Sequence, residues 1–322
     1  MAGYLLTGGA GFIGSNIVEA LLKRGEAVRV LDDFSTSDPG NLAPLLMGRR
    51  LELIDGDIRD LETCRRAAGG MDFVLHQAAL GSVPRSVADP LTTDAVNVRG
   101  TLNVLLAARD AKVRRFVYAS SSSIYGDQPL PPGQAGPLPK VETMPPRPLS
   151  PYAVSKLAAE SYCKVFYHAY GLETVCLRYF NIFGPRQDPE SRYAAVVPKF
   201  ATALRDGIPA TIYGDGGQSR DFTFVANAVS ANLLACEAAE AAGEVFNIGC
   251  GTSFSVRALL STLEDISGRR AEVDMQPPRS GDVRDSMADI AKARRLLGYE
   301  PMVGFRQGLE ATWAWYAARP LG

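Results

Sequence analysis

The stretch TGGAGFIG at residues 7–14 decides how this chain folds. It follows a short apolar run at residues 4–7 and opens a segment whose apolar side chains recur at helical spacing. Glycines at positions 8, 11 and 14 permit a tight turn, let backbone amides approach a pyrophosphate, and let the helix pack against the strand. The stretch therefore predicts a strand, a glycine-rich turn and a helix whose N-terminus binds a dinucleotide.

Short apolar runs rich in β-branched residues alternate with helix-length amphipathic segments through the first half of the chain. Continuous apolar runs indicate strands that are buried on both faces, as in a parallel sheet covered by helices. These runs occupy residues 4–7, 27–31, 51–54, 73–75, 115–119 and 174–177. The pattern predicts an α/β protein with a Rossmann-type doubly wound parallel sheet.

The rhythm changes near residue 179, where glycine and proline clusters begin to separate shorter elements. We therefore expect a dinucleotide-binding domain at residues 1–178 and a smaller mixed α/β substrate domain at residues 179–322. Some later segments are expected to return to the first domain, because no flexible linker marks a boundary. The proline-rich residues 127–148 predict a loop.

Composition excludes several classes of function. Lysine and arginine number 34 against 35 acidic residues, so no global basic field attracts nucleic acid or an anionic membrane. No apolar run approaches the length of about 20 residues that spans a bilayer. Five scattered cysteines without a C-x-x-C pair favour a reducing cytoplasm. Two histidines leave little material for a metal site or a Ser-His-Asp triad, so no metal is expected.

Polar positions follow the second, third and fourth predicted strands. Asp32 ends the second, where a carboxylate can accept hydrogen bonds from ribose hydroxyls and would repel a 2′-phosphate, which favours NAD over NADP. Asp57 and Ile58 follow the third and are candidates for contacting adenine. Residues 77–81 follow the fourth, at the edge where open parallel sheets bind ligands. The alternative for each is an ordinary loop.

Tyr152 and Lys156 are four residues apart near the start of a predicted helix, so they share one face. A nearby ammonium and a positively charged nicotinamide ring would both favour the phenolate, which makes Tyr152 a candidate general base. Serines at positions 120–123 close the fifth strand, where one can share a hydrogen bond with the hydroxyl that Tyr152 deprotonates. The alternatives are an interfacial tyrosine beside a solvated lysine, and a polar turn.

Together these features resemble the extended short-chain dehydrogenase/reductases, specifically UDP-hexose 4-epimerases, and most closely bacterial UDP-N-acetylglucosamine 4-epimerases. The matching segments are TGGAGFIG, HQAALGSV, NVRGTLNVL, SSSSIYGD, SPYAVSKLAAE, LRYFNIFGPRQDP, YGDGGQSRDF and RSGDVRDSMAD. The resemblance implies NAD as cofactor, Tyr152 as base, Lys156 as its electrostatic partner and Ser121 as the serine bonded to the sugar 4-hydroxyl. Candidate NAD contacts are Gly8, Gly11, Phe12, Ile13, Gly14, Asp32, Asp33, Phe34, Ser35, Thr36, Asp57, Ile58, Gln77, Ala78, Ala79, Asn97, Tyr152, Lys156 and Tyr179.

The resemblance also implies a UDP-sugar substrate. Its candidate contacts are Gly81, Ser82, Ser121, Ser122, Tyr152, Asn181, Ala195, Val196, Tyr213, Arg220, Arg279, Asp282 and Ser286. The two arginines match positions on the diphosphate, where a guanidinium suits phosphate oxygens. Sugar-nucleotide dehydratases carry acids where Ser122 and Ser123 stand, so we expect reversible oxidation through a 4-keto sugar.

Ser286 stands where epimerases restricted to unacetylated sugars have tyrosine, and this favours interconversion of UDP-GlcNAc and UDP-GalNAc. The alternatives are a UDP-glucose/UDP-galactose epimerase, a UDP-glucuronate 4-epimerase, and a non-catalytic NAD-binding regulator. Relatives usually carry aspartate where Asn227 stands, a departure that we expect to be structural. The family further implies a homodimer that pairs through helices at residues 92–109 and 152–170.

Overall fold

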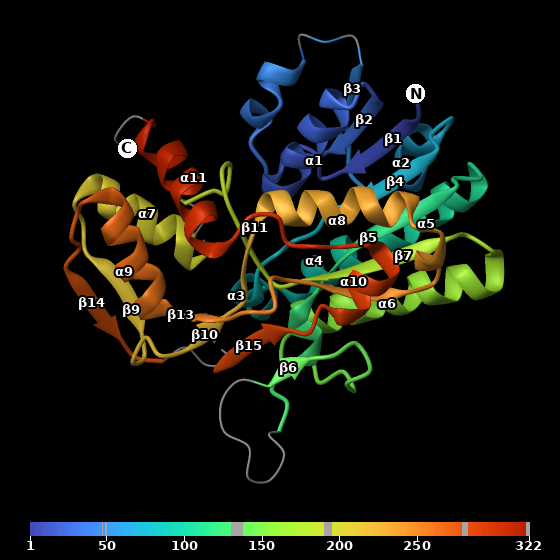
Figure 1. The fold of residues 1–322 in the computed structure, drawn as a ribbon. Helices are drawn as coiled ribbons and strands as arrows, with labels where there is room; N and C mark the ends of the chain where they lie inside the picture. The colour runs from blue at the N-terminus through green and yellow to red at the C-terminus, as the bar shows by residue number, and fades with distance from the viewer. Residues whose placement is uncertain (47, 49, 130–137, 190–194, 279–282, 320–322) are drawn as a thin grey trace.

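A seven-stranded parallel sheet forms the centre of the computed structural model, which describes residues 1–322 except 47, 49, 130–137, 190–194, 279–282 and 320–322. The strands lie in the order β12 (Val245–Ile248), β7 (Thr174–Tyr179), β5 (Arg115–Ser121), β4 (Phe73–His76), β1 (Gly3–Thr7), β2 (Ala27–Asp32) and β3 (Leu51–Asp55). All six neighbouring pairs are parallel (Figure 1). The predicted Rossmann-type sheet is confirmed, and its seventh strand, β12, comes from the second half of the chain.

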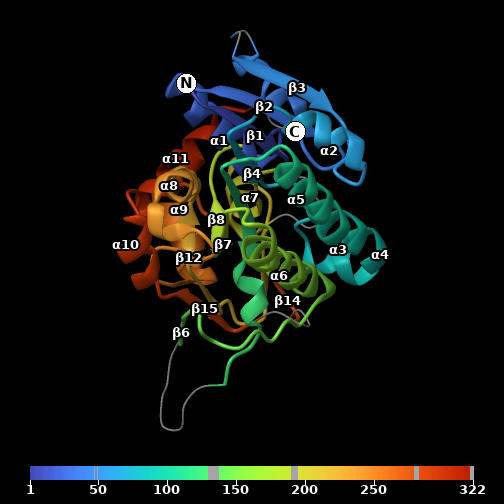
Figure 2. The ribbon, with the colours of Figure 1, turned by 90° about the vertical axis from the view of Figure 1, so that its right-hand side faces the viewer.

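Helices cover both faces of this sheet. One face carries α1 (Phe12–Lys23) and α8 (Val225–Glu237), and the other carries α2 (Leu61–Ala68), α5 (Thr101–Asp110) and α6 (Pro151–Tyr170). Figure 2 shows α8 on one side of the strands and α5 and α6 on the other. Successive side chains of a strand enter opposite cores, so Leu5 packs with α2, α5 and α6 while Leu6 packs with α1 and α8.

A third hydrophobic core lies beside the main sheet, towards the left of Figure 1. It is built from α7 (Val196–Asp206), α9 (Val256–Ser267), α11 (Phe305–Ala317) and β9 (Ala210–Tyr213), which pairs with β14 (Val273–Gln276). A second two-stranded sheet pairs β8 (Asn181–Phe183) with β11 (Phe222–Phe224). These short elements surround the end of β7, where the chain leaves the main sheet.

A small four-stranded sheet has the order β13 (Phe254–Ser255), β10 (Ser219–Arg220), β15 (Asp285–Ala288) and β6 (Pro139–Lys140). The prediction of a continuous loop over residues 127–148 is therefore wrong at Pro139–Lys140. A proline is accepted there because β6 is an edge strand, which does not need every backbone donor. The remaining helices and turns are η1 (Pro39–Asn41), η2 (Ala43–Leu45), α3 (Val83–Ala88), α4 (Pro90–Asp94), η3 (Ala95–Gly100), η4 (Ser122–Tyr125), η5 (Ala239–Ala241) and α10 (Ala291–Leu297).

Candidate functional site

The glycine-rich turn lies between β1 and α1 and is packed too closely for side chains. Gly8 has a φ of 68°, and a Cβ there would stand 2.6 Å from the backbone nitrogen of Ala78. A Cβ on Gly14 would stand 2.1 Å from the carbonyl oxygen of Gly8. The turn, the helix and the loop after β4 are thus in backbone contact, which leaves the N-terminus of α1 open towards a cavity of ≈ 620 Å³.

A smaller cavity of ≈ 100 Å³ adjoins the turn beside Asp32. The buried carboxylate of Asp32 accepts hydrogen bonds from the backbone nitrogen of Ala10 at 2.9 Å and from Ser37 Oγ at 2.7 Å. Each carboxylate oxygen accepts more than one bond, so this anchoring leaves capacity for ligand hydroxyls. Other predicted cofactor contacts that line this cavity are Gly8, Gly11, Asp33, Ser35, Thr36, Ile58, Gln77, Ala78 and Ala79.

Three predicted cofactor contacts lie off the described cavity walls. Asp57 pairs with Arg59, whose Nε donates to it at 2.7 Å and lowers the pKa of the carboxyl group. Phe34 packs against the hydrophobic core instead. Asn97 is buried in the π-helical turn η3, where it donates to the carbonyl oxygen of Leu80 and to Ser155 Oγ, at 3.2 and 3.0 Å. Asn97 therefore joins the loop after β4 to α6.

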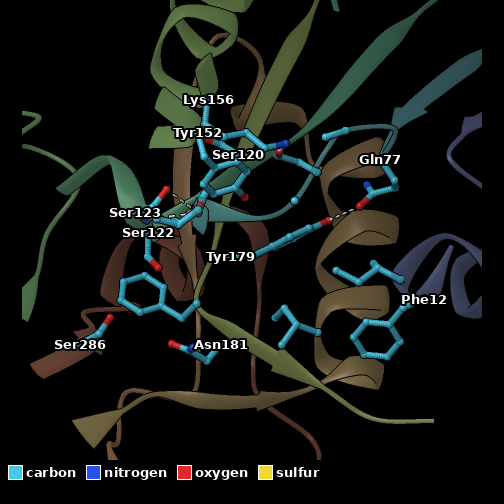
Figure 3. Close-up of a pocket in the computed structure, with 18 of the residues that line it drawn as sticks. Phe12, Gln77, Ser120, Ser122, Ser123, Tyr152, Lys156, Tyr179, Asn181 and Ser286 are labelled. Atoms are coloured by element: carbon cyan, nitrogen blue, oxygen red, sulfur yellow. Dashed lines mark hydrogen bonds between the residues drawn. The ribbon is translucent and has the colours of Figure 1, made fainter. Parts of the chain in front are cut away.

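The first turn of α6 carries the predicted catalytic pair. Ser150 Oγ accepts a hydrogen bond from the backbone nitrogen of Ala153, and Pro151 follows at the first helical position, so the helix start is fixed as predicted. Tyr152 and Lys156 then project from one face into the larger cavity (Figure 3). Lys156 Nζ donates to the carbonyl oxygen of Ala119 at 2.8 Å and lies 5.9 Å from the centre of the Tyr152 ring.

Ser121, at the end of β5, forms a side-chain hydrogen bond with Tyr152. Its Oγ also accepts from the backbone nitrogen and the hydroxyl of Ser123, at 3.2 and 2.9 Å. Figure 3 shows Ser122, Ser123, Tyr152 and Lys156 together on one side of the cavity. Ser121 from β5 and Tyr152 and Lys156 from α6, which the sequence predicted to form one site, line the same cavity.

Burial dominates the electrostatics of this group. It raises the pKa of Tyr152 above its ordinary value, and the hydrogen bond with Ser121 offsets only part of that rise. Burial also lowers the pKa of Lys156 to about 8. In the chain by itself, desolvation is the largest influence on the Tyr152 hydroxyl, so its predicted role as a base depends on the positive nicotinamide ring as well as on the ammonium.

A second cavity of ≈ 340 Å³ adjoins the larger one, and Val83, Asn181, Ile182 and Arg220 line both. Predicted substrate contacts on its walls are Asn181, Ala195, Val196, Tyr213 and Arg220, and those on the larger cavity are Gly81, Ser121, Ser122, Tyr152, Asn181, Arg220 and Ser286. Ser82 is not among the residues that line either cavity. Its Oγ caps α3 by accepting a hydrogen bond from the backbone nitrogen of Arg85. Arg279 and Asp282 lie outside the described residues.

Several lining residues were missed by the sequence analysis. They include Lys140, which lies outside every matching segment, and Gln187 and Gln218, which lie within LRYFNIFGPRQDP and YGDGGQSRDF but were assigned no role. The predicted cofactor contacts Gly8, Gly11, Phe12, Ile13, Gly14, Thr36, Gln77, Ala79 and Tyr179 do line the larger cavity. Within the described ranges, no group of three His, Cys, Asp or Glu residues could hold a metal ion. No described helix is long and apolar enough to cross a membrane.

The chain matches known proteins along nearly its whole length. Residues 4–249 match the model of the NAD dependent epimerase/dehydratase family. A UDP-glucose 4-epimerase of Mycolicibacterium smegmatis is 39% identical over 310 residues, which cover 96% of each chain. The structure of a UDP-N-acetylglucosamine 4-epimerase from Methanobrevibacter ruminantium superposes with a TM-score of 0.91 at 36% identity and covers 98% of both chains. A Thermus thermophilus UDP-glucose 4-epimerase in complex with NAD gives 0.88 at 39% identity, with 98% of this chain and 99% of that chain covered.

Proposed function

The chain belongs to the NAD dependent epimerase/dehydratase family, and we propose that it is the isomerase that interconverts UDP-N-acetylglucosamine and UDP-N-acetylgalactosamine. NAD is the cofactor of this family. The observation that carries the proposal is the position of Tyr152, which lies with Ser121 and Lys156 in the larger cavity, between the glycine-rich turn and the wall that bears Arg220 and Ser286.

The residues around the glycine-rich turn fit NAD. The turn presents backbone at positions where a Cβ would collide, so a pyrophosphate can approach the amides at the start of α1. Asp32 holds its carboxylate beside the smaller cavity, where it can accept from ribose hydroxyls. When bound there, NAD would supply reversible hydride transfer at C4 of the sugar, from one face of the carbon and back to the other.

Tyr152 takes the proton of the sugar 4-hydroxyl and later returns it. Its hydrogen bond with Ser121 favours the ionised phenol, and Lys156 holds a positive charge below its pKa of about 8. Because burial raises the pKa of Tyr152, the proton moves readily only when further positive charge stands beside the ring. The positive ring of the oxidised cofactor would supply that charge when the 4-hydroxyl loses its proton, and its neutralisation by the hydride would favour return of the proton from Tyr152.

The walls of the cavity favour epimerisation over elimination of water. No aspartate or glutamate is present among the described residues that line the larger cavity. The buried carboxylate of Glu160, which follows Lys156 on α6, accepts from Ser120 at 2.8 Å and from Arg178 at 2.7 and 2.9 Å, so it is committed to an ion pair. A sugar-nucleotide dehydratase needs an acid to protonate the leaving hydroxyl, and no described lining residue offers one.

Small side chains at the sugar end support the acetylated substrate. Ser286 lines the larger cavity and Ala195 the second one, and both leave volume for a 2-acetamido group. The alternative substrates are UDP-glucose, UDP-galactose and UDP-glucuronate, and the alternative of another class is an NAD-binding regulator without activity.

A panel of nucleotide sugars tests the proposal. Each UDP-sugar is incubated with the NAD-loaded protein, and the C4 epimers are resolved by NMR. We expect UDP-GlcNAc to equilibrate with UDP-GalNAc, at a higher kcat/KM than any unacetylated sugar gives. A higher kcat/KM for UDP-glucose or UDP-glucuronate would assign the alternative substrate, and no epimerisation of any sugar would assign the regulator.

We also propose a homodimer. Exposed apolar residues gather on α3, α4 and α6, where Val87 is 65% exposed, Leu91 82%, and Val154 and Val165 each 52%. These three helices pack together (Figure 2). The predicted interface helix at residues 92–109 is less suited, because most apolar residues of α5 are buried. Light scattering should give a dimer that Val165→Asp dissociates.

All five cysteines are free, which supports a cytoplasmic location.

A further inference from the structure

Lys140 is a charged residue buried in the wall of the larger cavity. It lies on β6, directly opposite Ala288 of β15. Ser286 precedes Ala288 by two residues, so Ser286, Ala288 and Lys140 lie on the same face of this small sheet. Lys140 and Ser286 both line the cavity, and Lys140 is only 5% exposed. A lysine and a small polar residue therefore share one wall.

The ammonium of Lys140 has no direct partner among the described residues. It makes no hydrogen bond or ion pair with them, and Asp127 and Asp285 act on it only through longer-range attraction. Burial lowers its pKa below the ordinary value. The side chain is thus largely covered while it lines the cavity, and no described group of the chain neutralises its ammonium, so a ligand group in the cavity is the partner that the position suits.

The side chains that line the cavity beside Lys140 indicate which group of a ligand its ammonium would bind. Ser122, Ser150 and Ser286 line the same cavity and can satisfy sugar hydroxyls, because a serine both donates and accepts. An ammonium only donates, and its hydrogen bonds are strongest to oxygens that only accept. The diphosphate is such a group, but Arg220 lies where the two cavities meet and is suited to it.

We propose that Lys140 is a specificity-determining residue that donates a hydrogen bond to the carbonyl oxygen of the 2-acetamido group. This inference rests on the proposed function, since it assumes that the acetamido group occupies the space beside Ser286. The small side chain of Ser286 then leaves space for the acetamido group, and the hydrogen bond from Lys140 stabilises the substrate that carries it. A plain hexose enters the same cavity and leaves the ammonium without its acceptor.

The test compares the NAD-loaded native protein with Lys140→Met, which keeps the length of the side chain and removes the charge. Lys23→Met, on the exposed last turn of α1, is the matched control. We expect Lys140→Met to lower kcat/KM for UDP-GlcNAc by about 10- to 100-fold, the usual effect of losing a hydrogen bond from a charged donor. Activity on UDP-glucose should change by less than about threefold, within the ordinary variation among neutral substitutions.

Thermal unfolding provides the readout that separates recognition from a structural role. Lys140→Met should not lower the Tm, because the ammonium has no partner among the described residues whose loss would destabilise the fold. A lowered Tm with equal losses on both sugars would overturn the inference and make Lys140 structural. A loss confined to UDP-glucuronate would also overturn it and assign a carboxylate as the acceptor. If the native protein does not epimerise UDP-GlcNAc at all, the proposed function itself fails.

Discussion

The two sides of the cavity differ in how completely their polar groups are paired. On the cofactor side, around the glycine-rich turn, Asp32, His76 and Asn97 are buried and each has at least two hydrogen-bond partners within the chain. On the sugar side, the side-chain oxygens of Gln187 and Gln218 are buried without a partner among the described residues. Tyr118 Oη and the Nη1 of Arg186, whose other terminal nitrogen pairs with Glu19 of α1, are exceptions on the cofactor side. We therefore expect the cofactor side to be closer to its ligand-bound form than the sugar side, where a ligand would satisfy the remaining glutamine oxygens.

Tyr152 stands at the junction of the two sides, and its replacement should have the largest effect. Tyr152→Phe keeps the ring and removes the group that exchanges the proton, so kcat should fall by about 10²- to 10⁴-fold. Bound NAD and the Tm should be unchanged, because neither side loses its other contacts. Steady-state epimerisation and the absorbance of bound cofactor measure this. Near-native turnover by the variant would show that another group acts as the base.

Gly14→Ala tests how rigid the cofactor side is. Alanine normally favours a helix, but here its Cβ meets the carbonyl oxygen of Gly8 at 2.1 Å, and backbone cannot move aside as a side chain can. We expect the free energy of unfolding in urea to drop by about 1–3 kcal/mol, and NAD affinity to fall with it.

The control for this variant is Gly69→Ala at the end of α2, where the new Cβ makes only ordinary contacts at 3.6 Å. Its unfolding free energy should change by less than about 0.5 kcal/mol. If Gly14→Ala changes the unfolding free energy as little as the control does, the backbone of the turn can move to accept the Cβ, and the cofactor side is not pre-formed.

Ser286→Tyr tests the sugar side, where we expect a larger side chain to change substrate selectivity without destabilising the fold. The larger side chain fills the space beside Lys140, so the ratio of kcat/KM for UDP-GlcNAc to that for UDP-glucose should fall about tenfold or more. The Tm should stay close to the native value, because Ser286 faces a cavity instead of a packed core. Equal losses on both sugars would place Ser286 away from the 2-substituent.

Acid stability should depend on His76. Burial lowers its pKa to about 3, and its two ring nitrogens contact Thr7 Oγ1 at 2.6 Å and Thr101 Oγ1 at 2.9 Å. Between pH 6.5 and pH 3 the unfolded chain binds the extra proton, so stability falls with decreasing pH by up to about 1.4 kcal/mol per pH unit. His76→Gln should remove this part of the slope, and the control His168→Gln should keep it. Parallel unfolding curves for both variants would contradict the assignment.

Six of the seven strands of the main sheet could be predicted because each has a local signature, whereas β12 was not predicted. The six predicted runs coincide with β1 to β5 and β7 to within two residues at each end. Most residues of β1, β2, β4, β5 and β7 are buried and need apolar side chains, whereas the edge strand β3 is largely exposed. β6 has only two residues and is defined by its pairing with β15, far along the chain. No local pattern could indicate it, and for the same reason Lys140 escaped notice.

The residues of the candidate site likewise divide into those that a local sequence signature predicts and those that it does not. Tyr152, Lys156 and Ser121 were predictable because a helix start and a strand end fix where their side chains point. Asp57 and Ser82 were assigned to ligands, but nearby backbone or side chains already engage them. Short polar side chains in loops often bond within their own turn, and sequence alone does not distinguish that use from ligand binding.

The return of β12 to the main sheet affects how the protein is made on the ribosome. β7 ends at Tyr179 and its neighbour β12 begins at Val245, so 65 residues (180–244) separate them. At a synthesis rate of about 5–20 residues per second, β7 waits about 3–13 s for that partner. During this interval the nascent chain presents an unpaired, apolar strand edge, which is the kind of surface that pairs with other chains. Slow translation or low chaperone capacity should therefore reduce the yield of this protein before any folded molecule exists.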